Sequence, residues 1–564
     1  IIIGFLNYPI KKGHVRVNHI PFYDVVLMVA GAGPFLYFAA NAQKILLTSY
    51  SVISKDPFML ALAIMAILVL VELCRRCVGL PILFVVGALL IYTFSNVRFG
   101  KVIYDLFYTT NGVMNTPINV CQKYIVVFII FGAFLERTSI SAFFIDLANC
   151  VAGSSCGGPA KVAVISSALC GMVSGSSVGN TVTTGSVTIP MMIKTGYKPE
   201  FAGAVEAAAS TGGQIMPPIM GAAAFLMAEY TGIPYSRIAV LAILPAILYF
   251  AGIYIAVHLE AKKLGLQGLD KDSLPKFSYL VKKLYLLAPL VVLVILVSNG
   301  TRTMQSSAAI AILVTIVVGL FNSDNRISLG KIIDALEAGG KGTITVASAC
   351  TMAGIVAGCI TSTGLASKLL RAIVSASGGV MIIALLLTMI CCIVLGMGVP
   401  TTATYCIMAA TCAPILMSPE IGVEMLAAHF FVFYFGIVAD ITPPVALAAY
   451  AGAAIAKAGP MKTAFNASRL AIAAFIVPYI IAMNPAMLFI NTTIQEVVMI
   501  TITSIIGIFG VAAGLSGFVF RNMKWWERIL CIVGGLTLLV PGSLTDLIGL
   551  VLVGAVCVLG FVFL

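Results

Sequence analysis

The chain has 564 residues, of which 60% are hydrophobic and 10% are charged, and its formal net charge is +12. Soluble domains are about a quarter charged, so this composition lacks the polar surface that a soluble core of this length needs. The apolar runs are long and continuous, which excludes a membrane β-barrel and predicts an all-α polytopic membrane protein. Basic pairs such as Lys262 and Lys263 lie in short loops, which is typical of contact with the lipid bilayer and makes nucleic acid an unnecessary partner.

A helix needs about 20 apolar residues to span a bilayer. Twelve stretches are candidate spans, at about 25–47, 58–73, 81–94, 121–135, 238–257, 284–297, 308–321, 344–360, 380–395, 465–481, 497–520 and 530–564. Most of the 14 cysteines lie inside such stretches and are expected to behave as small hydrophobic residues. Cys74 and Cys77 form one Cys-x-x-Cys motif, but no further ligands stand at zinc spacing, so we predict no metal beyond an alkali cation and no cofactor.

Four sequence matches divide the central part of the chain into two similar halves. Residues 132–141, 156–158, 174–190 and 212–218 match residues 358–367, 377–379, 398–414 and 439–444, respectively, at separations of 221 to 226 residues. A charged linker at 262–283 lies between the halves. Internal repeats of this size are typical of secondary transporters.

Each half contains two unusual segments at equivalent positions. The first is rich in small and hydroxyl residues between apolar arms that are too short to span separately, which predicts re-entrant helical hairpins at about 166–196 and 380–416. The second carries a double proline, which predicts broken helices at about 200–231 and 427–456. A break in hydrocarbon survives only where protein buries it or where it lines a wet cavity.

The meeting point of hairpin tip and break is therefore the candidate site in each half. Freed carbonyls and hydroxyls are suitable ligands for a hard cation, and the half-helix N-termini present partial positive charge to an anion. Small and hydroxyl residues also mediate plain helix packing. The presence of a matched pair of each segment favours a transport site over packing alone.

Ionisable residues inside apolar runs also indicate a functional site, because their burial in the membrane is energetically unfavourable. Asp440 stands in the second break, and its partner position in the first half is the neutral Gln214. Three roles stay open for Asp440: cation ligand, proton carrier, or internal pairing. Glu206 and His429 are expected mainly to hold helices together, with proton coupling as the alternative.

Catalytic motifs are missing from the sequence. No Walker loop, HExxH or GxSxG occurs, so neither direct ATP drive nor a known hydrolase chemistry is predicted. We expect a transporter and not an enzyme. A channel is disfavoured because the polar residues cluster at mid-depth and do not line whole helices.

Several segments resemble a known family. These segments are residues 71–79 (VELCRRCVG), 157–197, 206–230, 395–405 (LGMGVPTTATY) and 428–454. They resemble the permease of TRAP transporters, in the TAXI subfamily, in which the small and large membrane subunits are fused. The resemblance implies an elevator-type ion-transporter-like fold with two inverted repeats, in a bacterial or archaeal cytoplasmic (inner) membrane. It also implies sodium-driven uptake of an organic anion, such as the dicarboxylate 2-oxoglutarate, delivered by a periplasmic TAXI-family substrate-binding protein.

The resemblance also implies a domain organisation. Residues 1–123 would be small-subunit-like scaffold helices, 124–261 the first large-subunit repeat, 262–343 the linker and connecting helices, 344–484 the second repeat, and 485–564 additional helices.

The resemblance also implies which residues of this sequence form the binding sites, from their positions in the matching motifs. The first cation site would use Ser176, Ser177, Asn180 and Gly213, and the second would use Gly396, Thr401, Thr404, Asp440 and Thr442. The substrate would lie near Ser174, Thr181, Pro217, Pro400 and Pro443. Because Asp440 has no acidic counterpart in the first half, protons stay open as an alternative to sodium. A carrier that works without a binding protein is the alternative function.

Overall fold

The computed structural model describes residues 1–11, 20–300, 302–322 and 325–562. Over these residues the chain is helical, and its one pair of bridged residues is Phe518 and Asn522. The predicted all-α polytopic membrane class is confirmed. Within the described residues, eight helices are long and apolar enough to cross a membrane, and nine if the pair α26 (Pro460–Leu470) and α27 (Ile472–Met483), bent by 40°, counts as one span.

The eight candidate spans fall in eight of the twelve predicted stretches. They are α2 (Phe22–Ala40), α5 (Pro57–Cys77), the segment Thr116–Glu136, α15 (Tyr235–Leu264), α18 (Met304–Phe321), α19 (Leu329–Thr363), α28 (Ile494–Ser516) and α30 (Ser543–Val562).

Three of the other predicted spans form single shorter apolar helices. Among them are α6 (Pro81–Asn96) and α21 (Met381–Gly396), of 16 residues each. Sixteen residues reach about 24 Å, which is less than the roughly 30 Å of a hydrocarbon core. The predicted stretch 530–564 is divided between α29 (Trp525–Thr537) and α30, because Pro541 and Gly542 interrupt it.

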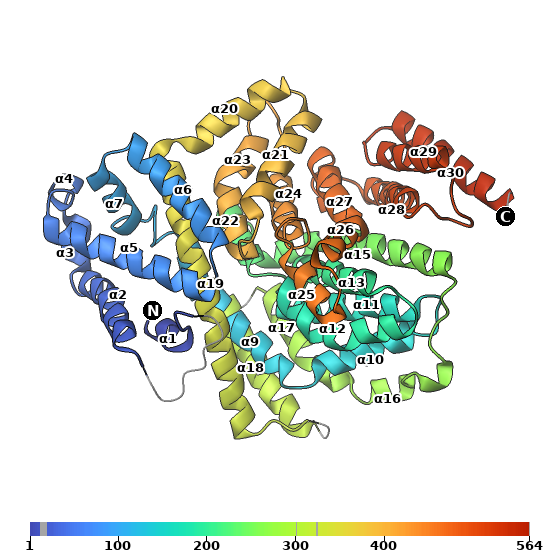
Figure 1. The fold of residues 1–564 in the computed structure, drawn as a ribbon, viewed down its shortest axis with the longest axis horizontal. Helices are drawn as coiled ribbons and strands as arrows, with labels where there is room; N and C mark the ends of the chain where they lie inside the picture. Colours follow the sequence, from blue (N-terminus) through green and yellow to red (C-terminus); the bar gives the residue numbers. More distant parts are fainter. Residues whose placement is uncertain (12–19, 301, 323–324, 563–564) are drawn as a thin grey trace.

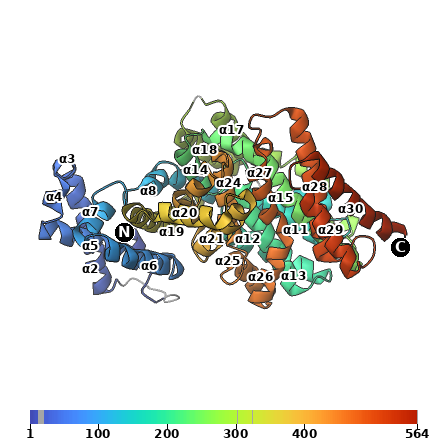
Figure 2. The same ribbon diagram turned by 90° about the horizontal axis from the view of Figure 1, so that it is seen from above.

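The long helix α19 connects the N-terminal helices to the rest of the molecule. Its 35 residues extend for about 52 Å. It contacts α5, α6 and α7 (Phe99–Phe107) on one side and α9 (Val126–Glu136) and α22 (Thr401–Thr411) on the other. Figures 1 and 2 show the N-terminal helices as a group at one end and α28–α30 at the opposite end.

The elements of the first half recur in the same order in the second. The first half contains α10 (Ile140–Ala152), α11 (Gly158–Ser174), α12 (Ser177–Lys194), α13 (Pro199–Gly212) and α14 (Ala223–Thr231). The second contains α20 (Leu365–Ser377), α21, α22, α24 (Met425–Val438) and α25 (Leu447–Ala456), with the short α23 (Ala413–Leu416) after α22. Both α10 and α20 have 13 residues and follow a left-handed residue, Ser139 or Gly364.

The two halves pack into one body. Helix α13 contacts both α25 and α26, and α12 also contacts α25. The backbones of α13 and α25 approach closely at Gly203 and Gly452: a Cβ on Gly203 would lie 2.9 Å from the carbonyl oxygen of Gly452. Small residues at this crossing allow close approach in a membrane, where dispersion and packing hold helices together.

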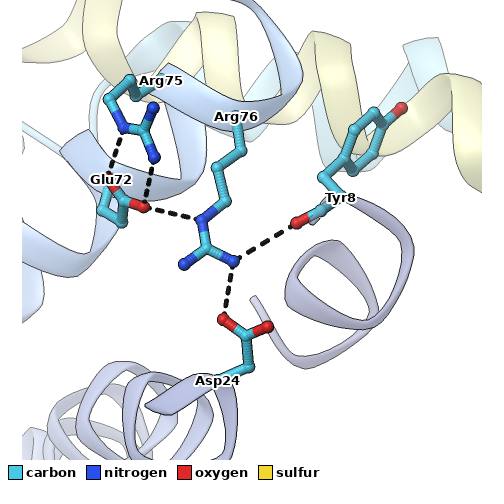
Figure 3. Close-up of polar contacts among 5 residues, drawn as sticks. All are labelled: Tyr8, Asp24, Glu72, Arg75 and Arg76. Atoms are coloured by element: carbon cyan, nitrogen blue, oxygen red, sulfur yellow. Dashed lines mark hydrogen bonds and ion pairs between the residues drawn. The ribbon is translucent and has the colours of Figure 1, made fainter. Parts of the chain in front are cut away.

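A buried ion-pair cluster holds the N-terminal helices together (Figure 3). Arg76, in the last turn of α5, donates to Asp24 of α2 at 2.7 Å and to Glu72 at 2.7 Å. It also donates to the backbone oxygen of Tyr8 at 3.3 Å, just after α1 (Ile2–Asn7). The side chains of Arg76 and Asp24 are fully buried, whereas Arg75, which also pairs with Glu72, is 36% exposed.

We expect Arg76→Met to loosen α1 and α2 from α5, because it leaves the Asp24 carboxylate buried without the guanidinium that faces it. Breaking one side of a buried pair costs about 3–5 kcal/mol, and the exposed pair broken by Arg75→Met is worth about 1 kcal/mol or less. Hydrogen exchange of the amides of α1 and α2 measures both effects. Equal exchange in the two variants would contradict this role for Arg76.

Candidate functional site

The first hairpin tip is a two-residue turn between α11 and α12. Helix α11 ends at Ser174, Gly175 has a φ of +61°, and the side chain of Ser176 accepts a hydrogen bond from the amide of Gly179 as the N-cap of α12. Glycine is required at position 175 because its φ is left-handed and because a Cβ would lie 2.8 Å from the carbonyl oxygen of Met220. The tip therefore packs directly against the break after α13.

The second tip repeats this arrangement. Helix α21 ends at Gly396, Gly398 has a φ of +69°, and Pro400 is the N-cap of α22. A Cβ on Gly398 would lie 2.7 Å from Pro81 at the start of α6 and 2.9 Å from Val445 in the break after α24. Each hairpin thus presents the start of its second helix to the break in its own half.

Both breaks close by an equivalent backbone hydrogen bond. The amide of Gly221 donates to the carbonyl of Gln214 at 2.7 Å, and the amide of Ala448 donates to the carbonyl of Asp440 at 2.9 Å. The Pro217–Pro218 and Pro443–Pro444 peptide bonds are both cis. The carbonyls of Gln214 and Asp440 thus have partners within the protein.

Asp440 joins all four of these segments. Its Oδ2 accepts hydrogen bonds from Ser177 Oγ in the first tip at 2.5 Å and from Thr401 Oγ1 in the second tip at 3.3 Å. The amide nitrogen of Gln214, in the first break, lies 3.4 Å from the same oxygen. Asp440 is buried, and no group of three or more His, Cys, Asp or Glu residues that could hold a metal occurs within the described residues.

A cavity of about 440 Å³ opens beside this junction. Its lining contains the first turns of four helices, represented by Ser177 of α12, Ala223 of α14, Thr401 of α22 and Leu447 of α25. The N-cap residues of α14, α22 and α25 make no side-chain hydrogen bond to these turns. Helix starts carry partial positive charge and amide donors, so the cavity combines four such starts with one acidic side chain.

The wall opposite the tips comes from other helices. Ile125 lies directly before α9 and Phe128 lies in α9. Gly342, Thr345 and Val346 lie in α19. The cavity therefore lies between the first hairpin tip and the helices α9 and α19, whereas α22 of the second hairpin packs directly against α19.

The residues predicted for a first cation site are divided between three positions. Asn180 points into the protein, where its Nδ2 donates to the carbonyl of Ser167 at 3.0 Å. Gly171 contacts both Gly213 and Asn180: a Cβ on Gly171 would be 2.5 Å from Gly213 Cα and 3.3 Å from Asn180 Nδ2. Ser176 caps α12, and Ser177 donates to Asp440.

The residues predicted for a second cation site repeat part of this geometry. A Cβ on Gly396 would lie 3.0 Å from Ala439 and 3.1 Å from Thr404 Cγ2, which parallels the arrangement of Gly171, Gly213 and Asn180. Thr404 donates to the carbonyl of Val399 at 3.1 Å, and Thr442 donates to the carbonyl of Val438 at 2.8 Å. Of this set, Thr401 and Asp440 line the cavity.

Two of the predicted substrate residues, Ser174 and Pro400, line the cavity. Ser174 Oγ is buried without a hydrogen-bond partner. The lining does not include Thr181, Pro217 or Pro443, and Thr181 donates to the carbonyl of Ser177 at 2.8 Å inside α12.

The other two ionisable residues lie away from the cavity lining. Glu206 is enclosed by hydroxyl groups from α11, α12 and α13. His429 Nδ1 lies 2.8 Å from the hydroxyl of Tyr405, which joins α24 to α22.

Sequence reasoning did not place Gln214 among the site residues. Its equivalence to Asp440 in the repeat was the available signal, since the two residues are separated by the same 226 positions as the double prolines. The contributions of Phe128, Gly342 and Thr345 carry no such signal, because ordinary helix packing uses the same residue types.

Comparisons with known proteins agree with one another. The family model described as the DctM component of the tripartite ATP-independent periplasmic transporter matches residues 64–495, and one described as a domain of unknown function matches residues 497–549. The C4-dicarboxylate TRAP transporter large permease protein of Pseudomonas aeruginosa is 26% identical over 34% of this chain and 45% of that protein. The isethionate TRAP transporter permease protein of Oleidesulfovibrio alaskensis is 24% identical over 59% of this chain and 52% of that protein.

A putative TRAP transporter large permease protein of Haemophilus influenzae is 25% identical over 56% of this chain and 74% of that protein. Among solved structures, the Alcanivorax borkumensis YdaH transporter matches with a TM-score of 0.48 and 16% identity over 71% of this chain and 96% of that chain. The matches to the first two relatives span about half of the length of each. Because the family model extends over more than half of the residues, the chain belongs to the family of the DctM component of tripartite ATP-independent periplasmic transporters.

Proposed function

We propose that the chain is the permease of a secondary active transporter that takes up a small organic anion. The observation that carries this proposal is the cavity where the starts of α12, α14, α22 and α25 meet Asp440. Each helix start carries roughly half a positive charge and binds anions through backbone amides. Such an anion site needs no lysine or arginine, and the described lining of the cavity contains neither.

The size and symmetry of this cavity support the proposed substrate class. Its volume of about 440 Å³ falls in the usual range for a small-molecule site. A C4 or C5 dicarboxylate such as 2-oxoglutarate has two carboxylates, so it can bind to helix starts from both halves at once. The names of two relatives, which refer to a C4-dicarboxylate and to isethionate, support an organic anion.

Asp440 is the proposed point of coupling to an ion gradient. An ionised carboxylate in the cavity repels an anionic substrate, so substrate binds best when a cation or a proton neutralises Asp440. Ser177 and Thr401 supply further oxygens to a cation held there. Na⁺ and H⁺ are both compatible with this role, and the experiments below separate them.

We further propose an elevator mechanism in which the hairpins and broken helices move together. The direct packing of α12 and α13 against α25 supports a single moving body, with α9 and α19 as the fixed wall of the cavity. In this proposal the substrate arrives from a periplasmic TAXI-type binding protein, the N-terminal helices replace a separate small subunit, and the chain lies in a cytoplasmic membrane. An anion carrier that needs no binding protein is the alternative.

Uptake of labelled 2-oxoglutarate into proteoliposomes tests the function and its alternative. We expect accumulation driven by a sodium gradient or by a pH gradient, imposed separately, and only in the presence of the purified TAXI-type binding protein. Accumulation without that protein would favour the independent carrier. The absence of accumulation and of exchange for every C4 and C5 dicarboxylate tried would contradict the proposed substrate class.

Asp440→Asn should abolish gradient-driven accumulation and preserve exchange of labelled for unlabelled substrate. The amide keeps the size of the side chain and can still contact both tips, but it neither attracts a cation nor releases a proton. Glu337→Gln is the matched control, because this carboxylate on α19 is 56% exposed and is not part of the cavity lining. Normal accumulation in Asp440→Asn would remove Asp440 from the coupling mechanism.

Ser177→Ala and Thr401→Val should each weaken the apparent affinity for the coupling ion. Loss of one hydroxyl that contacts a buried charge costs about 1–3 kcal/mol, so we expect a roughly ten- to hundredfold increase in the ion concentration for half-maximal uptake. Thr183→Val is the control, since Thr183 lies on the exposed face of α12 and donates to the carbonyl of Gly179. An unchanged ion dependence in both tip variants would contradict their proposed role.

A further inference from the structure

Glu206 lies at the centre of a hydroxyl cage inside the body formed by the two halves. It is fully buried in α13. Its carboxylate accepts hydrogen bonds from Ser167 of α11, Thr184 and Thr188 of α12, and Ser210 of α13. Ser167 Oγ and Ser210 Oγ lie 2.5 and 3.1 Å, respectively, from Oε1. Four hydroxyls around one carboxyl group form a polar site that the proposed coupling at Asp440 does not use.

The cage contains no positive charge. No ion pair joins Glu206 to a basic residue within the described part of the chain. Two ionisable groups on the packed helices have other partners: Cys170 of α11 donates to the carbonyl of Ser141 at 4.0 Å, and Tyr249 of α15 donates to the carbonyl of Ala208 at 2.6 Å.

Many of the other charged groups on the helices around α13 lie at helix ends or have partners elsewhere. At helix ends are Glu200 of α13, Lys194 of α12, Lys457 of α25, Lys262 and Lys263 of α15, and Glu136 of α9, which packs on α11. Lys161 of α11 donates to Ser155, Arg469 of α26 pairs with Glu260, and His429 of α24 contacts Tyr405. An ionised carboxylate with only neutral partners is costly to bury, so the neutral acid is an accessible state of this group.

The hydroxyls can satisfy both protonation states of Glu206. Thr184 Oγ1 lies 2.8 Å from the carbonyl of Asn180, and Thr188 Oγ1 lies 3.1 Å from the carbonyl of Thr184. Each hydroxyl has one hydrogen and can also accept. When Glu206 is ionised, the threonines donate to it. When it is protonated, a threonine donates to its helix carbonyl instead and accepts the proton of the acid.

A metal cation does not fit the same cage. Oxygens that share a cation lie about 2.3–2.6 Å from the ion and therefore well over 3 Å from each other when they surround it. Ser167 Oγ and Glu206 Oε1 are 2.5 Å apart, as are Ser177 Oγ and Asp440 Oδ2, and both are hydrogen-bond distances with no ion between the oxygens. Asp440 lines the central cavity, where a cation has space beside it, whereas hydroxyl groups enclose Glu206 away from that cavity. The ligand that suits this geometry is a proton.

The cage also communicates with the first hairpin tip. Asn180 Nδ2 donates to Ser210 Oγ at 3.2 Å, and the amide of Asn180 donates to the carbonyl of Ser176 in the tip. A small cavity of about 10 Å³ lies between Asn180 and Ser174, and Ser174 also lines the central cavity. This volume is near the lower limit for one water molecule. Polar groups therefore extend from Glu206 towards the substrate cavity.

We propose that Glu206 and its hydroxyl cage form a second ion site of the permease, specific for a proton, which Glu206 binds from water on one side of the membrane and releases on the other. The inference rests on the proposed transport function for its role in the cycle, but proton binding itself is a property of the purified chain. Thr184, Thr188, Ser167 and Ser210 are positioning residues, since each acts by holding the carboxyl group.

Infrared difference spectra of the purified chain between acidic and alkaline buffer test proton binding without any substrate. We expect a carbonyl band of a protonated carboxyl group that is absent from the spectra of Glu206→Gln. Thr188→Val retains the carboxyl group but removes one hydrogen-bond partner, so the same band should change frequency. Ser186→Ala, on the exposed face of α12 and outside the lining of both cavities, should leave the band unchanged.

Two results would overturn the proposal: spectra of Glu206→Gln identical to those of the wild type, or a Thr188→Val band at the wild-type frequency. The second comparison also decides the matter if Glu206→Gln does not fold. In proteoliposomes, Glu206→Gln should lose accumulation driven by a pH gradient and keep exchange of labelled 2-oxoglutarate. If the infrared band responds as expected and no substrate moves in any variant, the transport function is wrong and the proton site stands.

Discussion

A single carboxylate oxygen, Asp440 Oδ2, holds together four segments that each interrupt a helix. Both hairpin tips donate to it, and the first break approaches it through Gln214. Interrupted helices in an apolar environment require partners for their exposed polar groups. The two halves supply these partners to each other, so neither half can form its site alone. The close packing of α12 and α13 against α25 follows from this mutual requirement.

In the proposed function, the charge distribution at the junction lets one cavity respond to both an anion and a cation. Four helix starts surround the cavity with partial positive charge, and Asp440 adds one full negative charge. When a cation or proton neutralises that carboxylate, the remaining field of the helix starts therefore favours an anion in the cavity. Glu206 differs in kind, because its neutral hydroxyl partners stabilise the group in either protonation state and lie away from the substrate cavity.

Local chemistry determined which features were predictable. The double prolines and the glycines at 175 and 398 impose breaks and turns on the backbone by themselves, so the sequence locates both tips and both breaks within a few residues of the structure. Side-chain direction depends on packing between distant helices. Asn180 faces Ser167 and Thr181 faces its own helix for that reason, and the opposite wall from Phe128 and Thr345 is made by residues that have no distinctive pattern. The count of spans was too high because apolar helices such as α6 are too short to cross alone.

Gln214 and Asp440 occupy equivalent positions of the repeat and meet each other at the centre of the molecule. A residue at such a position faces its own counterpart, so identical halves would place two copies of one side chain in contact. Two aspartates there would repel each other, and two glutamines would leave no charge for an ion. Duplication of one ancestral half could therefore yield the scaffold but not the proposed coupling site, and divergence at this one position makes the two halves differ in charge.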